Sequence, residues 1–219
     1  MVPTSISEAS TNLTRVGLIT MAMLVSATAF TSCSDDDDDS DNYSYVDLGL
    51  SVKWATCNIG AESPEEYGDY FAFGEIEPKD SYSSTNSVTY GVDMTDIAGN
   101  AEYDAARYLW GKKWRIPTED EILELIDDCT WSTNTLDGTS GFRVTGPSGK
   151  SIFLPCAGYM KGTSVNYRTE QCRYWSSTPD EDGDVAAAIG ASNKLTIVSY
   201  QREASYYRYI GLSIRPVRK

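Results

Sequence analysis

Cysteine is the most reactive side chain in this chain of 219 residues, which contains five cysteines and no histidine. Without histidine there is no imidazole base for a Ser-His-Asp or Cys-His arrangement, no histidine-ligated zinc and no imidazole pH switch. A catalytic cysteine would also lack the base that usually activates its thiol. We therefore expect a protein that is not an enzyme and that carries no cofactor.

The acidic side chains offer two further kinds of chemistry. Residues 180–184 place three aspartates at alternate positions around a glycine, a spacing compatible with a calcium loop, although the downstream glutamate of an EF-hand is missing. We favour a solvated loop at the end of a hairpin and predict no metal site. No spacing singles out two carboxylates for glycoside hydrolysis, and we interpret Glu75 and Glu77 as surface charges.

The segment from Asn166 to Arg208 is rich in tyrosine, with serine, asparagine and arginine between the tyrosines. Tyrosine and arginine dominate binding hot spots, and mixtures of tyrosine, serine and asparagine are typical of antibody paratopes. The alternative is the ordinary tyrosine-rich surface of a small β domain. We expect a ligand-binding surface made by Tyr167, Arg173, Tyr174, Asp180, Asp182, Tyr200, Arg202, Tyr206 and Tyr207.

The N-terminal residues predict export. Val16 to Phe30 form an uncharged apolar run after Arg15, shorter than the roughly 20 residues of a membrane span and suited to the core of a signal peptide. The run ends in Phe-Thr-Ser before Cys33, which resembles a lipobox, so we expect residues 1–32 to be a lipoprotein signal peptide and Cys33 to be lipidated. An ordinary secretory signal and an uncleaved anchor are the alternatives.

An acidic tether is expected over residues 33–44. Asp35 to Asp39 follow Cys33 almost directly, and such a run is solvated and self-repelling. It resembles the acidic export signal of Bacteroidota-type surface lipoproteins. We therefore expect an outer-membrane lipoprotein that is held in the lipid by Cys33 and faces outward, with a plain spacer on the periplasmic side as the alternative.

The remaining residues, 45–219, are expected to form one domain. The whole chain has a net charge of -14, but residues 45–219 hold 25 acidic and 17 basic side chains, a net charge of -8. That balance is ordinary for a soluble domain and gives no basic face for nucleic acid. A length of 175 residues fits one hydrophobic core.

Four cysteines remain in this domain once Cys33 is assigned to the lipid. An even number in an exported domain suggests disulfides, with three possible connectivities. We favour Cys57 with Cys129 and Cys156 with Cys172. The alternative for the first pair is a buried free thiol, because Cys129 lies on the apolar stripe of a predicted helix.

Two helices are predicted. The longer helix begins with the capping box from Thr118 to Glu121, and its apolar stripe consists of Ile122, Leu125, Ile126 and Cys129. A shorter helix is expected over residues 101–109, ended by Gly111. Its expected inward side chains are Ala105, Tyr108 and Leu109.

The other elements are predicted to be strands, so the fold class is α+β. Residues 142–145 and 151–154 flank a turn at 146–149, and residues 185–189 and 195–200 flank a turn at 191–194.

The ends of the domain are also predicted to be strands. Ile210, Leu212 and Ile214 alternate with smaller or polar residues, which predicts a half-buried closing strand. Strand candidates at 45–50 and 52–56 could pair with it. Three tryptophans in strand-like or turn motifs are expected in the core: Trp54, Trp114 and Trp175.

Four short motifs carry a family resemblance. They are YVDLGLSVKWATCN at 45–58, WRIPT at 114–118, YWSST at 174–178 and GLSIRPV at 211–217. In this order they resemble the Fibrobacter succinogenes major paralogous domain family, over essentially all of residues 45–218. The resemblance implies a C-type-lectin-like fold, with two short helices, a small twisted sheet with paired termini, and long loops that carry recognition.

The same fold occurs in formylglycine-generating enzymes, whose cysteine pair binds copper. Cys156 and Cys172 are the nearest candidates here, but their surroundings do not match that site. The segment between Trp175 and Gly211 is also similar to the variable region of C-type-lectin-fold proteins that retroelements diversify.

These observations lead us to expect a non-enzymatic recognition or adhesion module on the cell surface. It would bind protein or glycan through its C-terminal loops, as a retroelement-diversified variable protein. The alternative is a glycan-binding or accessory-enzyme component of an outer-membrane nutrient-uptake system. A structural spacer without a ligand is the third interpretation.

Overall fold

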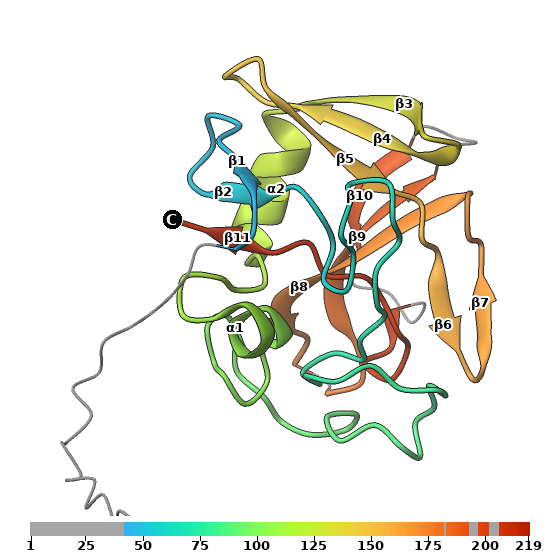
Figure 1. Ribbon diagram of the computed structural model, residues 1–219. Coiled ribbons are helices and arrows are strands. Elements are labelled where there is room, and N and C mark those ends of the chain that lie inside the picture. The colour runs from blue at the N-terminus through green and yellow to red at the C-terminus, as the bar shows by residue number, and fades with distance from the viewer. Residues whose placement is uncertain (1–41, 182, 193–196, 202–205) are drawn as a thin grey trace, which may run out of the picture. The chain divides into compact units, whose positions relative to one another are not determined.

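The computed structural model describes residues 42–181, 183–192, 197–201 and 206–219, with the backbone alone for residues 197–201. These residues form two short helices and several small antiparallel sheets, which confirms the α+β class (Figure 1). The helices are α1 (Ala105–Trp110) and α2 (Glu119–Asp127). The strands are β1 (Tyr45–Val46), β2 (Lys53–Ala55), β3 (Thr130–Leu136), β4 (Thr139–Thr145), β5 (Ser151–Pro155), β6 (Tyr159–Lys161), β7 (Ser164–Asn166), β8 (Gln171–Pro179), β9 (Ala186–Ser192), β10 (Ile197–Gln201) and β11 (Val217–Arg218).

The first and last strands belong to one sheet, with β2 between them, and the pairing segment is Val217–Arg218 rather than the predicted closing strand at residues 210–215. Their sheet has the order β1-β2-β11, and Val217 of β11 lies opposite Trp54 of β2. Figure 1 shows β1 and β2 in blue beside β11 in red. The strands at this end are shorter than the candidates at 45–50 and 52–56.

The hairpin predicted around residues 146–149 is present as β4 and β5, with Thr145 opposite Ser151. The sheet continues into β3, which the sequence analysis did not predict. Asp137 and Gly138 connect β3 to β4, with φ angles of 43° and 85°. Asp-Gly is a strong signal for a two-residue hairpin because both positions need positive φ, so this strand pair could have been found from the sequence.

The second predicted hairpin is present as β9 and β10, where Ile197 lies opposite Ser192. Its turn was expected to begin at Ala191, but Ala191 and Ser192 still belong to β9. Residues 193–196 lie outside the described residues. Strand β8 completes this sheet, and β6 and β7 form a separate hairpin.

The three tryptophans lie in the core, as predicted: Trp54, Trp114 and Trp175 are almost fully buried. Trp114 and Trp175 pack in one cluster with Phe71, while Trp54 packs in another with Leu125 of α2.

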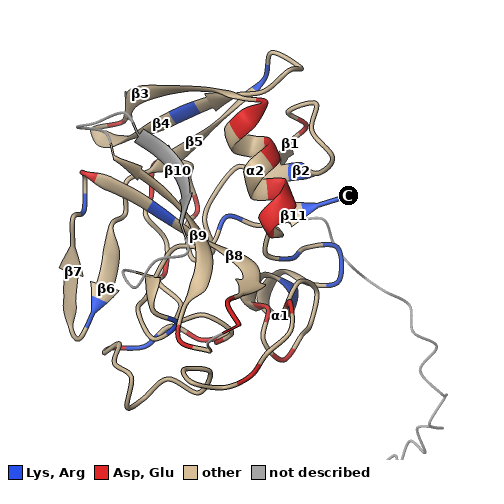
Figure 2. Cartoon of the chain, turned by 180° about the vertical axis from the view of Figure 1, so that it is seen from behind, with Lys and Arg blue, Asp and Glu red and all other residues tan. Residues whose placement is uncertain are grey.

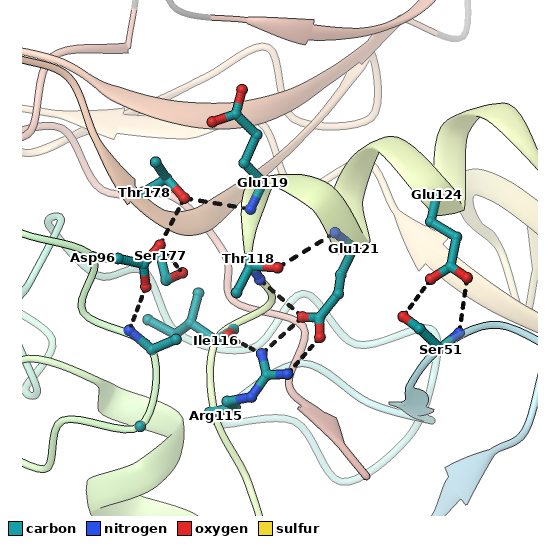
Figure 3. Close-up of polar contacts among 12 residues, drawn as sticks. Ser51, Asp96, Arg115, Ile116, Thr118, Glu119, Glu121, Glu124, Ser177 and Thr178 are labelled. Carbon is teal, nitrogen blue, oxygen red and sulfur yellow. Dashed lines mark hydrogen bonds and ion pairs between the residues drawn. The ribbon is translucent and has the colours of Figure 1, made fainter.

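The capping box of α2 is confirmed (Figure 3). The hydroxyl of Thr118 accepts a bond from the backbone N–H of Glu121, and the Glu121 carboxylate accepts one from the N–H of Thr118. Arg115 donates two bonds to the same carboxylate. Burial alone would raise the pKa of Glu121, but the bonds from Arg115 and Thr118 outweigh burial and lower the pKa.

Further polar contacts fix α2 to its neighbours (Figure 3). The Thr178 hydroxyl accepts a bond from the N–H of Glu119 and donates to Asp96. At the next turn, the Glu124 carboxylate accepts bonds from the N–H and the hydroxyl of Ser51. The first turn of α2 is thereby joined to the end of β8, and its middle to the loop before β2.

The prediction for α1 was wrong in its start and in its buried face. Helix α1 begins at Ala105, because the Asp104 carboxylate accepts a bond from the N–H of Arg107 and so caps the helix there. It ends at Gly111 as expected. Tyr108 and Leu109 are exposed, and the buried side chains are Ala105, Ala106 and Trp110.

The half-buried closing strand was also predicted wrongly, because residues 210–217 are all buried. Arg215 was placed on the exposed face, yet it is 1% exposed. Its guanidinium donates to the side-chain oxygen of Asn58 (2.9 Å) and to the carbonyl oxygens of Ala55 (3.1 Å), Thr56 (2.5 Å) and Phe153 (2.9 Å). These bonds connect the C-terminal segment to β2, to the loop after β2 and to β5.

Arg208 is also fully buried, and it too connects distant segments through hydrogen bonds to backbone oxygens. Its guanidinium lies 5.3 Å from the centre of the Phe73 ring. It donates to the carbonyl oxygens of Thr89 (3.3 Å), Val92 (2.7 Å), Asp180 (2.8 Å) and Val185 (3.0 Å). Burial lowers the pKa of Arg208 and of Arg215.

One of the two favoured disulfides is confirmed. Cys156 and Cys172 are bonded, whereas Cys57 and Cys129 are free thiols, so the predicted Cys57–Cys129 bridge is wrong. Cys129 packs against the core cluster that contains α2, as the free-thiol alternative required. Burial raises the pKa of Cys129 to about 11.

Arg215→Met should lower the free energy of unfolding by about 3 kcal/mol or more, because its oxygen acceptors would stay buried without donors. Urea denaturation of residues 34–219 measures the change. Arg143→Met is the matched control, since Arg143 is exposed on β4 and should change stability by about 0.5 kcal/mol or less. Equal effects of the two substitutions would contradict the structural role of Arg215.

Thiol titration of residues 34–219 in denaturant should detect two free thiols without reductant and four after reduction. The reason is that Cys57 and Cys129 are unpaired, while Cys156 and Cys172 are bonded. Finding no free thiol before reduction would show that Cys57 and Cys129 are also bridged.

Candidate ligand-binding site

The structure separates the predicted binding residues from one another. Tyr174 lies on the inward side of β8, 1% exposed, and its hydroxyl donates to the carbonyl of Pro155 (2.8 Å). Burial raises the pKa of Tyr174 to about 12. The prediction that Tyr174 contacts a ligand is therefore wrong, because the side chain is part of the core.

Several other predicted residues cannot be assigned to the site. Asp182 and Arg202 lie outside the described residues, and only the backbone of Tyr200 in β10 is described. Tyr207 is half-buried in a separate aromatic cluster, stacked on Tyr209 with ring centres 5.2 Å apart. The ring of Tyr90 meets Tyr209 edge-on.

The aspartate loop at 180–184 is held from within the protein. The carbonyl oxygens of Asp180 and Val185 both accept bonds from the Arg208 guanidinium, and the Asp180 carboxylate accepts the N–H of Glu181. Arg208 thereby ties both ends of this segment to the C-terminal part of the chain. Among the described residues, no group of three or more acidic or cysteine side chains is arranged to hold a metal.

Glu75 is not the surface charge that we expected. It is 9% exposed, and its carboxylate pairs with Lys79 (2.6 Å) and accepts the N–H of Val88 (3.1 Å). Glu77 is exposed, as predicted. Glu75 thus anchors the loop between residues 75 and 88.

Three of the predicted residues, Tyr167, Arg173 and Tyr206, do meet in one arrangement, which we call the tyrosine–arginine stack. The Arg173 guanidinium lies between two rings, 4.4 Å from the centre of Tyr159 and 4.7 Å from that of Tyr206. Tyr159 in turn stacks on Tyr167, with ring centres 6.0 Å apart and an angle of 27° between the planes. Tyr206 is 4% exposed and forms the inner end, whereas Tyr167 is 52% exposed and forms the outer end.

Tyr159 was not predicted to contact a ligand, because Tyr159 lies before the tyrosine-rich segment that begins at Asn166. It reaches the stack through the β6–β7 hairpin, where Tyr159 lies opposite Asn166, next to Tyr167. Gly158 permits this close pairing, since a Cβ at that position would lie 2.0 Å from the carbonyl oxygen of Asn166. Only the strand register, and no local pattern, could have identified Tyr159.

The disulfide fixes the base of this region. Cys156 precedes β6 and Cys172 lies in β8, so the bond joins the two sides of the β6–β7 excursion. The carbonyl of Cys156 accepts the N–H of Thr169 (2.8 Å), and the carbonyl of Gln171 accepts that of Gly158 (2.8 Å). The turn that carries Tyr167 is therefore tied to the core at several points.

That turn is strained. Tyr167 and Thr169 have φ angles of 54° and 69°, in the left-handed region that a β-branched threonine rarely adopts. Each such residue costs about 1–3 kcal/mol and persists only where surrounding contacts enforce it. The carbonyl of Tyr167 accepts the N–H groups of both Glu170 and Gln171. Strain of this kind is concentrated at functional sites.

A second arginine flanks the turn. The Arg168 guanidinium lies 4.9 Å from the centre of the Tyr67 ring and donates to the Tyr70 hydroxyl (3.2 Å). That hydroxyl donates to the carbonyl of Ala157 (2.6 Å). Figure 2 shows basic positions on β6 and β8, whereas acidic positions follow α2 and the loops near α1.

A polar groove of about 710 Å³ adjoins the strained turn. It lies between the tip of the β3–β4 hairpin and the residues just before β8. Its lining is Thr133, Asn134, Thr135, Ser140, Gly141, Thr169 and Glu170. The turn from Tyr167 to Glu170 therefore contributes to both the stack and the groove.

A second hollowed face of the domain lies around Val88, whose side chain is 71% exposed. Two adjoining hollows, of about 430 and 290 Å³, share Val88 and Tyr103 in their linings. Acidic residues such as Glu77 and Asp93 also line them. This face is the competing candidate for ligand binding.

Comparisons with protein-family models, with curated proteins and with solved structures found no match for this chain. The family resemblance of residues 45–218 therefore stays a prediction. Within the described part of the chain, no helix has the length and apolar composition needed to cross a membrane.

Thr169→Gly should leave the free energy of unfolding unchanged or raise it by up to about 1 kcal/mol, because glycine relieves the positive φ. Thr139→Gly is the matched control: Thr139 is an ordinary strand residue of β4, and its replacement should cost about 1 kcal/mol. Urea denaturation compares the two. A larger loss at Thr169 than at Thr139 would contradict the strain at this turn.

Proposed function

We propose that this protein is a non-enzymatic recognition module that binds protein or glycan through the tyrosine–arginine stack. In this proposal a lipid on Cys33 anchors the protein in the outer membrane, and the acidic residues 34–44 hold the domain away from the cell surface. The arrangement of two short helices, small sheets, one sheet that contains both the first and the last strand, and long loops supports a C-type-lectin-like fold.

The observation that carries the proposal is the position of Arg173 between the rings of Tyr159 and Tyr206. Stacking holds these side chains in place before any ligand arrives, so binding would cost little conformational entropy. The stack ends in the half-exposed ring of Tyr167. Such rigid tyrosine and arginine side chains are the usual anchors of binding surfaces.

The state of the cysteines supports binding over catalysis. Cys156 and Cys172 are buried and bonded to each other, so neither offers a thiolate to copper or to a substrate. Burial also raises the pKa of the Cys129 thiol, which makes it a poor nucleophile at neutral pH.

In this proposal, a retroelement diversifies the segment between Trp175 and Gly211. Tyr206 and Arg208 in this segment are buried, so we expect variation to spare these two positions. A neighbouring reverse-transcriptase gene and an imperfect template repeat in the DNA would support diversification, and their absence would contradict it.

The second candidate is a glycan-binding component of an outer-membrane nutrient-uptake system. The polar groove beside the stack favours it, because its lining consists of hydroxyl, amide and carboxylate side chains around one glycine. Both candidates use the same surface and differ in the assembly to which the protein belongs.

Residues 34–219 applied to glycan and protein arrays should bind at least one ligand. Tyr167→Ala and Arg173→Ala should each weaken that binding about tenfold or more, because each removes one member of the stack. Thermal unfolding should confirm that both variants are folded.

Tyr108→Ala is the matched control, because Tyr108 on α1 is 53% exposed and Tyr167 is 52% exposed. It should leave binding unchanged. Absence of any ligand on both arrays, or equal losses for Tyr108→Ala and Tyr167→Ala, would refute the proposal. Turnover of a polysaccharide would refute the non-enzymatic part.

A further inference from the structure

We infer that the groove beside the tyrosine–arginine stack binds an uncharged oligosaccharide. This inference rests on the proposed function and names the ligand class of the same surface.

The lining matches a polyol. Thr133, Thr135, Ser140 and Thr169 are hydroxyl residues of the lining, and Thr135 lies directly opposite Ser140 on one face of the hairpin. Hydroxyl groups both donate and accept hydrogen bonds, as the hydroxyl groups of a sugar do. A protein partner would instead be expected to place apolar or aromatic anchors in a desolvated pocket, and this groove offers no large apolar side chain among its described lining residues.

The charge of the groove favours a neutral ligand. Glu170 is the charged residue in the described lining, and no lysine or arginine is found there. A uronate, a phosphate or an acidic peptide would meet this carboxylate inside the groove. The nearby arginines lie outside the described lining, with Arg168 on Tyr67 and Tyr70 and Arg173 on the rings of Tyr159 and Tyr206. The net charge of -8 on residues 45–219 also favours a neutral ligand over an acidic one. A carboxylate accepts hydrogen bonds from two neutral hydroxyl groups.

An exposed aromatic ring lies on the turn that borders the groove, two residues before Thr169 of the lining. The carbonyl of Tyr167 accepts the N–H of Glu170 (3.1 Å), so the exposed ring and the groove lining belong to one tight turn. A flat, half-exposed ring offers an apolar surface for the C–H face of a pyranose. A volume of about 710 Å³ also lies within the usual range of ligand sites, about 300–1,000 Å³.

Isothermal titration calorimetry of residues 34–219 tests the inference. The neutral probes are cellohexaose, xylohexaose, mannohexaose and maltohexaose, and the acidic probe is hexagalacturonate. At least one neutral probe should bind more tightly than hexagalacturonate. Thr135→Ala and Ser140→Ala should each weaken that binding by about threefold to tenfold, because each removes hydrogen bonds to the sugar.

Ser132→Ala is the matched control for Ser140→Ala. Ser132 lies on the same hairpin, in β3, and does not line the groove, so this substitution should leave affinity unchanged. Thermal unfolding of each variant establishes that it is folded.

Three results would overturn the inference: tighter binding of hexagalacturonate, no binding of any neutral probe, or neutral binding that is unaffected by both groove substitutions. The proposed function would survive all three if an array ligand still depended on Tyr167. It would fail together with the inference if no ligand depended on Tyr167.

Discussion

Two buried guanidinium groups hydrogen-bond the C-terminal segment to distant strands and loops of this domain. Long loops leave backbone carbonyl groups without partners in a sheet, and a buried carbonyl without a donor is costly. Arg208 and Arg215, both near the C-terminus, each donate to four oxygens on distant segments. Desolvation of a cation is expensive, and these oxygens together offset that cost.

These contacts also explain how a strained turn can persist. Arg215 holds β5 through the carbonyl of Phe153, and the chain then runs directly to the disulfide at Cys156. Met160 of β6 exchanges two backbone bonds with Gly211, in the same C-terminal segment. The positive φ angles at Tyr167 and Thr169 are thus enforced by a frame on both sides, and the stack is rigid before a ligand binds.

Local patterns predicted those parts of the fold that local interactions determine. The capping box of α2 and the two predicted hairpins are set by neighbouring residues, and Asp137-Gly138 would have revealed β3. Burial was harder to predict, because residue type does not determine it. Arg215 was expected to be exposed because it alternates with Leu212 and Ile214, and Tyr174 because tyrosine is common at binding surfaces, yet both are buried.

The candidate site could be predicted only in part. Tyr167, Arg173 and Tyr206 were identified from composition, whereas Tyr159 joins them through strand register. The groove depends on the approach of β3 to the turn before β8, two segments about 35 residues apart in the chain. No periodicity reports such a contact. The Cys57–Cys129 pairing failed for the same reason, since counting cysteines gives no distances.

Chemical-shift mapping by NMR tests most directly whether this surface is the ligand site. The experiment titrates isotopically labelled residues 34–219 with the four neutral hexasaccharides together. We predict that the largest shifts fall on residues 133–135, 140–141 and 167–170 and on the ring of Tyr159. Shifts confined to the face around Val88 and Tyr103, or no shifts at all, would contradict this account.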